Sequence, residues 1–341
     1  MIKPAKLEKG DTIAFIGPSS GLGGMFPHRV DKAKKSLESL GFNVKVFPTA
    51  KNNVKGKAGT VDERISDLHE AFTDNQIKAI LCVIGGFSCN ELITKIDYQI
   101  IKKNPKIFCG YSDITILHYS ILKKTGLTTF YGPCAMTQFG EYPNSLDYTI
   151  QYFLKAVTRA SPIGKVEPSK SWTDETLDWS KKLDTKRPRN LYQNEGFQWI
   201  NAGKAKGKTI GGCLYSLLQL RGTEFDGNYK NKVFFIETPE GQEFGKGEPL
   251  NYIDAQLTDL KNSGVFDKIR GLIVGRPFGY KGKEKAFEEV IRDHTKDYSF
   301  PVLCNVNIGH ADPIITLPLG VKVTLDSEKN LFSVDESGVK T

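Results

Sequence analysis

The first 125 residues alternate between short apolar runs and segments whose apolar side chains recur at a helical spacing. Residues 11–17, 44–47 and 79–84 are predicted strands, and residues 29–40 and 61–72 are predicted amphipathic helices. The run at 79–84 reads AILCVI and is apolar on both faces, as strands inside parallel sheets are. Repeated strand–helix units predict an α/β fold in which helices cover both faces of a parallel sheet.

The second half of the chain again alternates strands and helices, but a segment of different character precedes it. That segment contains all three tryptophans together with proline and many charges, and it has little periodicity. The strands predicted after it lie at 232–236, 271–274, 302–306 and 322–325, with a closing hairpin over 317–334. We therefore predict an N-terminal α/β domain over 1–160, a linker and tryptophan-containing insertion over 161–200, and a C-terminal domain over 201–341.

Composition narrows the class of protein. No apolar run approaches the roughly 20 residues of a membrane span, and no apolar segment follows the basic N-terminus, so the cytoplasm is the expected compartment. The six cysteines form no C-x-x-C pair and no metal-binding pattern. The net charge of +8 suits an anionic ligand, and the run KKLDTKRPR at 181–189 is its densest part. Elsewhere basic and acidic residues are interspersed, so neither a nucleic acid nor a membrane is an expected partner.

The stretch CGYSDIT, residues 109–115, places Ser112 between a predicted buried strand and a predicted helix. A serine at such a junction is usually an N-cap, because its hydroxyl accepts from an unpaired backbone N–H. The same turn is also typical of a nucleophile elbow, and Gly110 permits a tight approach there. The amide of Asp113 and an amide of the Gly85–Gly86 loop then become candidate donors to an oxyanion.

A serine nucleophile needs a base, and the base needs an orienting carboxylate. His310, in the loop NIGHADP, follows a predicted strand, whereas the other four histidines are interpreted as structural. Glu237 closes the apolar strand VFFIE, and Glu240 and Glu243 are rival carboxylates in the glycine-rich loop after it. The chain order Ser, Glu, His occurs in known catalytic triads.

Five motifs, taken in order, resemble those of the LD-carboxypeptidase family of serine peptidases (peptidase family S66): VIGGFSCNEL, GYSDIT, GGCLYSLLQLRGT, FFIETPE and NIGHADP. The resemblance implies an N-terminal α/β domain like class I glutamine amidotransferases, a smaller C-terminal swivelling β/α domain, and a homodimer. It implies Ser112 as nucleophile, His310 as general base and Glu237 as its orienter. Gly86 and Asp113 would supply the oxyanion amides, and neither a metal nor a cofactor is expected.

The family has two main branches, and the insertion SWTDETLDWSKK resembles the branch of the microcin C self-immunity carboxypeptidase. That branch cleaves the amide between an aminoacyl group and a modified adenylate, and the other trims D-alanine from murein tetrapeptides. The resemblance implies a small peptide or peptidyl-nucleotide substrate. It implies a tryptophan that stacks on the nucleobase, with Trp179 as the first candidate and Trp172 as the second. Cys213 departs from this branch, whose members often have asparagine there.

Other interpretations of the same residues stay open. Trp172 and Trp179 can simply pin the insertion to the body of the protein. The chain can be a non-catalytic nucleotide-binding module that makes no use of His310. A thiol-dependent enzyme would instead use Cys89, Cys109 or Cys213.

Overall fold

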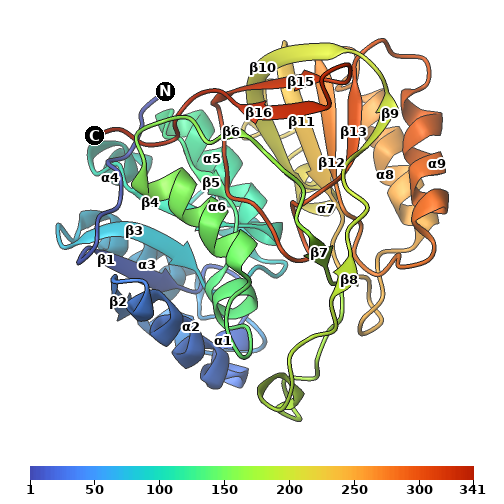
Figure 1. Ribbon diagram of the computed structural model, residues 1–341. Coiled ribbons are helices and arrows are strands. Elements are labelled where there is room, and N and C mark those ends of the chain that lie inside the picture. Colours follow the sequence, from blue (N-terminus) through green and yellow to red (C-terminus); the bar gives the residue numbers. More distant parts are fainter.

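The computed structural model describes all 341 residues and contains two large β-sheets that lie side by side, each flanked by helices, and a third sheet of two strands (Figure 1). The first sheet has the strand order β14-β5-β4-β3-β1-β2. Its strands are β1 (Thr12–Ile16), β2 (Asn43–Val46), β3 (Ile77–Cys82), β4 (Ile107–Gly110), β5 (Phe130–Tyr131) and β14 (Leu317–Pro318). All neighbouring pairs are parallel except β14 with β5.

Helices cover both faces of the first sheet, as the apolar strands predict. Along β1, Ile13 and Phe15 join one buried cluster, which includes residues of α2 and α6, and Ala14 and Ile16 join another, which includes residues of α3 and α5. The helices of this half are α1 (Leu22–Met25), α2 (Pro27–Ser39), α3 (Val61–Thr73), α4 (Tyr98–Lys103), α5 (Thr115–Thr125) and α6 (Asp147–Thr158).

The second sheet has the strand order β6-β16-β15-β10-β11-β12-β13-β9. Its parallel centre consists of β10 (Lys204–Cys213), β11 (Lys232–Glu237), β12 (Gly271–Gly275) and β13 (Val302–Val306). Its antiparallel flanks are β6 (Gly164–Lys165), β9 (Gln198–Asn201), β15 (Lys322–Asp326) and β16 (Leu331–Val334). The helices of this half are α7 (Leu214–Gln219), α8 (Leu250–Asn262) and α9 (Glu284–Thr295). None of the helices in either half has the length and apolar character needed to cross a membrane.

The chain crosses between the two sheets late in the sequence. The predicted hairpin over 317–334 is wrong in its first part, because Leu317 and Pro318 pair with β5 of the first sheet and only β15 and β16 form the hairpin. One buried apolar cluster of 65 residues continues from the first sheet into the second. The two halves therefore share a core, and the proposed boundaries at 160 and 200 stay a prediction.

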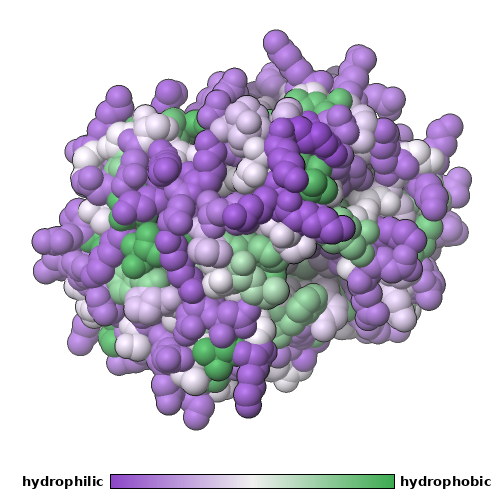
Figure 2. Space-filling model, turned by 90° about the horizontal axis from the view of Figure 1, so that it is seen from below, coloured by the Kyte–Doolittle hydropathy of each residue, from purple (hydrophilic) through white to green (hydrophobic).

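The insertion carries a two-stranded ribbon, β7 (Ser171–Trp172) and β8 (Tyr192–Gln193), and a loop that extends to the bottom of Figure 1. Figure 2 looks onto this lower side, where hydrophilic residues surround small hydrophobic areas. The ribbon is fastened next to His310, because Thr173 and Asp312 exchange backbone hydrogen bonds of 2.8 and 2.9 Å. Farther along, Asp184 accepts from Arg29 Nη1 at 2.8 Å. The insertion is thus attached to both halves of the molecule.

Candidate active site

Ser112 lies at the sharp turn between β4 and α5, with a backbone φ of +64°. This left-handed conformation is uncommon for a residue with a side chain and is the conformation of a nucleophile elbow. A side chain at Gly110 would place its Cβ 3.1 Å from Cys82 and Ile114, so glycine permits the close turn. Ser112 is the first residue of the helical turn, whose N-cap position is Tyr111, and its hydroxyl bonds His310 rather than a backbone N–H, so it is not an N-cap.

The hydroxyl of Ser112 instead faces an imidazole from the other half of the chain. His310 Nε2 lies 3.1 Å from Ser112 Oγ, and His310 Nδ1 lies 2.7 Å from Glu237 Oε2. Glu237 ends β11 and is fully buried, and His310 is 8% exposed in the loop after β13. The structure therefore brings together the alcohol, imidazole and carboxylate that the sequence analysis singled out.

The charge state of His310 reflects two opposing effects. Burial lowers the pKa of the imidazole, but the negative charge and hydrogen bond of Glu237, with smaller contributions from Glu240 and Asp312, raise it to about 9. The imidazole can accept a proton at Nε2 only when it is neutral. Its environment therefore favours the imidazolium that proton transfer from Ser112 would produce.

The two rival carboxylates occupy different positions. Glu240 Oε2 lies 4.0 Å from His310 Nε2, which is the nitrogen that faces Ser112, and its side chain is about half exposed. Glu243 is more exposed and pairs with Lys246. Only Glu237 bonds Nδ1, so neither rival can orient the ring.

The candidate oxyanion amides lie beside Ser112. A Cβ built on Gly85 would lie 2.9 Å from Ser112 Cβ and 3.3 Å from the Asp113 nitrogen, so this loop packs directly against the turn. The N–H groups of Gly86 and Asp113 donate to no protein acceptor. The Asp113 carboxylate holds the loop, since its Oδ2 accepts from the nitrogens of Ser88 and Cys89, both at 2.9 Å.

Two polar side chains that the sequence analysis missed hold the Ser112 backbone. The Tyr131 hydroxyl donates to Glu237 Oε1 at 2.5 Å and accepts from the Ser112 nitrogen at 3.2 Å. The Thr115 hydroxyl donates to the Ser112 carbonyl at 2.6 Å. Tyr131 ends the short strand β5, which neighbours β4, so the placement of residues at strand ends is the signal that would have found it.

The two candidate tryptophans differ in accessibility. Trp172 is 5% exposed, and its ring packs on Arg276 at 4.5 Å and Tyr192 at 5.5 Å between centres. Its contacts favour the interpretation that it pins the insertion, and its role in substrate binding stays a prediction. Trp179 is partly exposed, with the Arg29 guanidinium 4.3 Å from its ring centre.

The cysteines considered for thiol chemistry are all buried and free. Burial raises the pKa of Cys89, Cys109 and Cys213 well above the usual value, which opposes the reactive thiolate. Cys213 contributes through its backbone, because its N–H donates to Thr115 Oγ1 at 3.0 Å.

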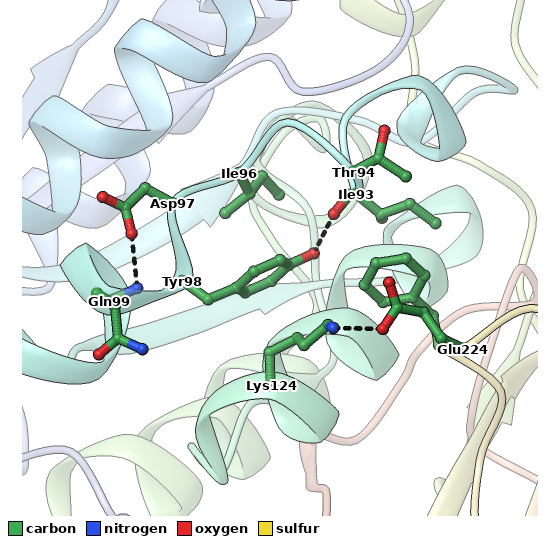
Figure 3. Close-up of a pocket in the computed structure, with 9 residues that line it drawn as sticks. Ile93, Thr94, Ile96, Asp97, Tyr98, Gln99, Lys124 and Glu224 are labelled. Carbon is green, nitrogen blue, oxygen red and sulfur yellow. Dashed lines mark hydrogen bonds and ion pairs between the residues drawn. The ribbon is translucent and has the colours of Figure 1, made fainter.

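Neither a cluster of metal ligands nor the pocket shown in Figure 3 competes with this site. Nowhere do three His, Cys, Asp or Glu side chains gather as metal ligands would. A surface pocket of about 380 Å³, shown in Figure 3, lies between residues 93–99, Lys124 and Glu224. Its polar groups pair with one another: Lys124 bonds Glu224 at 2.5 Å, and Tyr98 donates to the Ile93 carbonyl at 2.7 Å.

Comparison with known proteins gives matches over both halves. The family model described as LD-carboxypeptidase N-terminal domain matches residues 13–132, and that of the LD-carboxypeptidase C-terminal domain matches residues 206–325. The chain is 34% identical to "Putative carboxypeptidase YocD" of Bacillus subtilis, covering 93% of each. It is 33% identical to the Microcin C7 self-immunity protein MccF of Escherichia coli, covering 99% of this chain and 96% of MccF. The "Probable murein peptide carboxypeptidase" of Bacillus subtilis is 32% identical, with 99% and 95% covered.

Solved structures agree with these matches. MccF in complex with glutamyl sulfamoyl guanosine superposes with a TM-score of 0.92 at 31% identity, over 100% of both chains. An MccF-like protein from Bacillus anthracis has a TM-score of 0.88 at 35% identity, over 98% of this chain and 100% of that one. The predicted two-domain α/β architecture is confirmed, and its likeness to glutamine amidotransferases stays a prediction. The family models match both halves of the chain, and the alignment with MccF covers 99% of it. The chain therefore belongs to the LD-carboxypeptidase family.

Proposed function

We propose that this chain is a serine carboxypeptidase that hydrolyses the amide joining an aminoacyl or peptidyl group to a nucleotide. The observation that carries the proposal is the continuous set of hydrogen bonds from Glu237 through His310 to Ser112. Such an arrangement activates an alcohol for acyl transfer.

In the proposed reaction Ser112 Oγ attacks the scissile carbonyl carbon while His310 Nε2 takes its proton. Glu237 keeps the other ring nitrogen protonated and stabilises the imidazolium. The amides of Gly86 and Asp113 donate to the oxyanion. The C–N bond then breaks as His310 returns the proton to the leaving nitrogen, and water releases the acyl group from Ser112 by the same steps.

The substrate class rests on three observations. MccF, whose chain aligns with this one along its whole length, has been solved with glutamyl sulfamoyl guanosine and with aspartyl sulfamoyl adenosine. Trp179 is partly exposed and offers an aromatic ring to a nucleobase. In the basic run at 181–189, Arg187 pairs with Glu175 and Arg189 with Asp312, so the exposed Lys182 and Lys186 are the charges left to attract a phosphate. Cleavage of murein tetrapeptides is the second candidate, favoured by the similarity to a murein peptide carboxypeptidase and by Cys213 in place of the asparagine frequent in the microcin branch.

We further propose a homodimer that works in the cytoplasm on small substrates. Both points rest on the family resemblance. Sedimentation of the purified protein tests the first, and fractionation of the source cells tests the second.

Incubating the purified protein with an aminoacyl sulfamoyl adenosine and with a murein tetrapeptide, side by side, tests the proposal. We expect cleavage of the nucleotide substrate, and loss of at least about 1,000-fold in kcat for Ser112→Ala, because a triad without its nucleophile retains little activity. A fluorophosphonate probe should label wild type and not the variant.

Release of D-alanine alone would favour the murein alternative, and nucleotide binding without cleavage or labelling would favour the non-catalytic module. Full activity in Ser112→Ala, with inhibition by iodoacetamide, would favour the thiol enzyme.

A further inference from the structure

We propose that Tyr131 is a positioning residue that couples the carboxylate of Glu237 to the backbone of the Ser112 turn, across the boundary between the two sheets. This inference rests on the proposed function, because positioning matters only if Ser112 and His310 act together. Tyr131 belongs to β5 of the first sheet and Glu237 to β11 of the second.

The direction of each hydrogen bond follows from proton count. Tyr131 has one hydroxyl hydrogen and contacts two polar groups. The Ser112 N–H can only donate, so the tyrosine oxygen accepts there and its hydrogen points to Glu237 Oε1. Burial raises the pKa of Tyr131 well above its usual value, so the phenol keeps this hydrogen. Tyr131 therefore links Glu237 Oε1 to the Ser112 nitrogen through a single oxygen, and this pair of hydrogen bonds is the Tyr131 bridge.

The bridge also determines which nitrogen of His310 is free. Tyr131 takes Oε1 of Glu237, and Oε2 is left to accept from His310 Nδ1 at 2.7 Å. A proton held at Nδ1 leaves a lone pair on Nε2, 3.1 Å from Ser112 Oγ. The Tyr131 hydroxyl therefore supports both the negative charge of Glu237 and the His310 tautomer that carries its proton on Nδ1.

The other side of Ser112 is held in a matching way. Thr115 donates to the Ser112 carbonyl and accepts from the nitrogen of Cys213 in β10, so this link also joins the two sheets. A Cβ on Gly212 would lie 2.4 Å from Thr115, which explains the glycine there. With both backbone groups of Ser112 bonded, the turn keeps its φ of +64° and its hydroxyl stays aimed at His310.

The substitution Tyr131→Phe removes only the bridging oxygen. We expect kcat to fall about 10- to 100-fold with KM within twofold, because a buried carboxylate loses a charge-assisted hydrogen bond. The hydrogen bond from Tyr131 stabilises the negative charge of Glu237 most when His310 is neutral and does not balance that charge. Losing this hydrogen bond should therefore favour the protonated imidazole and raise the pKa of His310. The acid limb of the pH profile, which is the pH range over which kcat/KM rises as His310 loses its proton, should therefore move to higher pH.

A matched control is Tyr119→Phe, which deletes an equally buried phenol oxygen on α5 that bonds none of Ser112, Glu237 and His310. It should change kcat less than twofold and leave the acid limb in place. Thermal unfolding verifies that both variants fold.

NMR titration of the His310 ring nitrogens, in protein labelled with ¹⁵N-histidine, reads the same effect without any substrate. If wild type cleaves neither substrate, the proposed function fails, and this titration still decides the role of Tyr131. A higher His310 pKa in Tyr131→Phe supports the role. An unchanged His310 pKa overturns it, and a fall in kcat would then mark Tyr131 as a packing residue.

Discussion

Ser112 combines a side chain with a backbone conformation that favours glycine. Holding such a conformation costs about 1–3 kcal/mol, which the surrounding structure must offset. Two hydrogen bonds provide part of that compensation: the Ser112 N–H donates to the Tyr131 hydroxyl, and the Thr115 hydroxyl donates to the Ser112 carbonyl. The same turn presents the hydroxyl of Ser112 to His310, as the proposed function requires.

The raised pKa of His310 leads to a prediction for the pH profile. Only the neutral ring accepts the Ser112 proton, so kcat/KM should rise with pH and level off near the pKa of about 9. Glu237→Gln removes the main charge that raises this pKa. Its acid limb should therefore move to lower pH, with a maximal rate lower by about 10⁴-fold, as when a triad carboxylate is replaced.

Measuring kcat/KM from pH 5 to 10 checks this prediction, with Glu243→Gln as the control. Glu243 is exposed and paired with Lys246, so its replacement should leave the profile in place. An acid limb at the same pH in wild type and Glu237→Gln would contradict the role of Glu237.

At the scale of elements, the insertion is the part of the fold to which we assign the choice between the two proposed substrates. Its ribbon β7–β8 is joined to the backbone of Asp312, two residues after His310, and Asp184 fastens its loop to Arg29 at the start of α2. Trp179 lies between these attachments and contacts Phe26 at 5.7 Å between ring centres. The ring is therefore held in place before a substrate arrives, which lowers the entropy cost of stacking.

Trp179→Ala should raise KM for an aminoacyl sulfamoyl adenosine about 5- to 100-fold, since one base–aromatic stack contributes about 1–3 kcal/mol. It should leave KM for a murein tetrapeptide within twofold if the protein accepts one, because that substrate has no base. Trp199→Ala is the matched control, since Trp199 lies on β9 and bonds Asn330. Equal effects of the two replacements on KM would show that Trp179 only fastens the insertion.

At the scale of the whole molecule, the two large sheets share one apolar core, and the first sheet includes β14 from the C-terminal half. Chains with separable domains often unfold in separate steps. Here β14 leaves the C-terminal half to pair with β5. The segment around Ser112 bonds β10 through Thr115 and β11 through Tyr131. These links make each half dependent on the other.

We therefore expect one cooperative thermal transition, and a replacement in one half should move it as a whole. Phe72→Ala, in α3, removes a buried ring from the shared cluster at a cost of about 3–5 kcal/mol. All three tryptophans lie at 172–199, so their fluorescence reports on the insertion and the start of the second sheet. Fluorescence and far-ultraviolet circular dichroism should shift together, and an unchanged fluorescence transition would show that the halves unfold independently.

The sequence by itself determined the elements and the candidate side chains. Strands and helices follow from apolar periodicity and turn residues, which act over a few positions, so the runs at 79–84 and 232–236 became β3 and β11 within two residues. Ser112, Glu237 and His310 each follow or end a predicted strand, where ligands of parallel sheets gather, which is why they stood out before any contact was known.

Only the tertiary structure decided how those side chains meet. Ser112 and His310 are 198 residues apart, and nothing local dictates that Nε2 rather than Nδ1 faces the hydroxyl. The burial of Trp172, the pairing of β14 with β5 and the bridge made by Tyr131 likewise depend on packing between distant segments. Periodicity reports which face of an element is buried, but the partner on that face is chosen by the fit of the whole core.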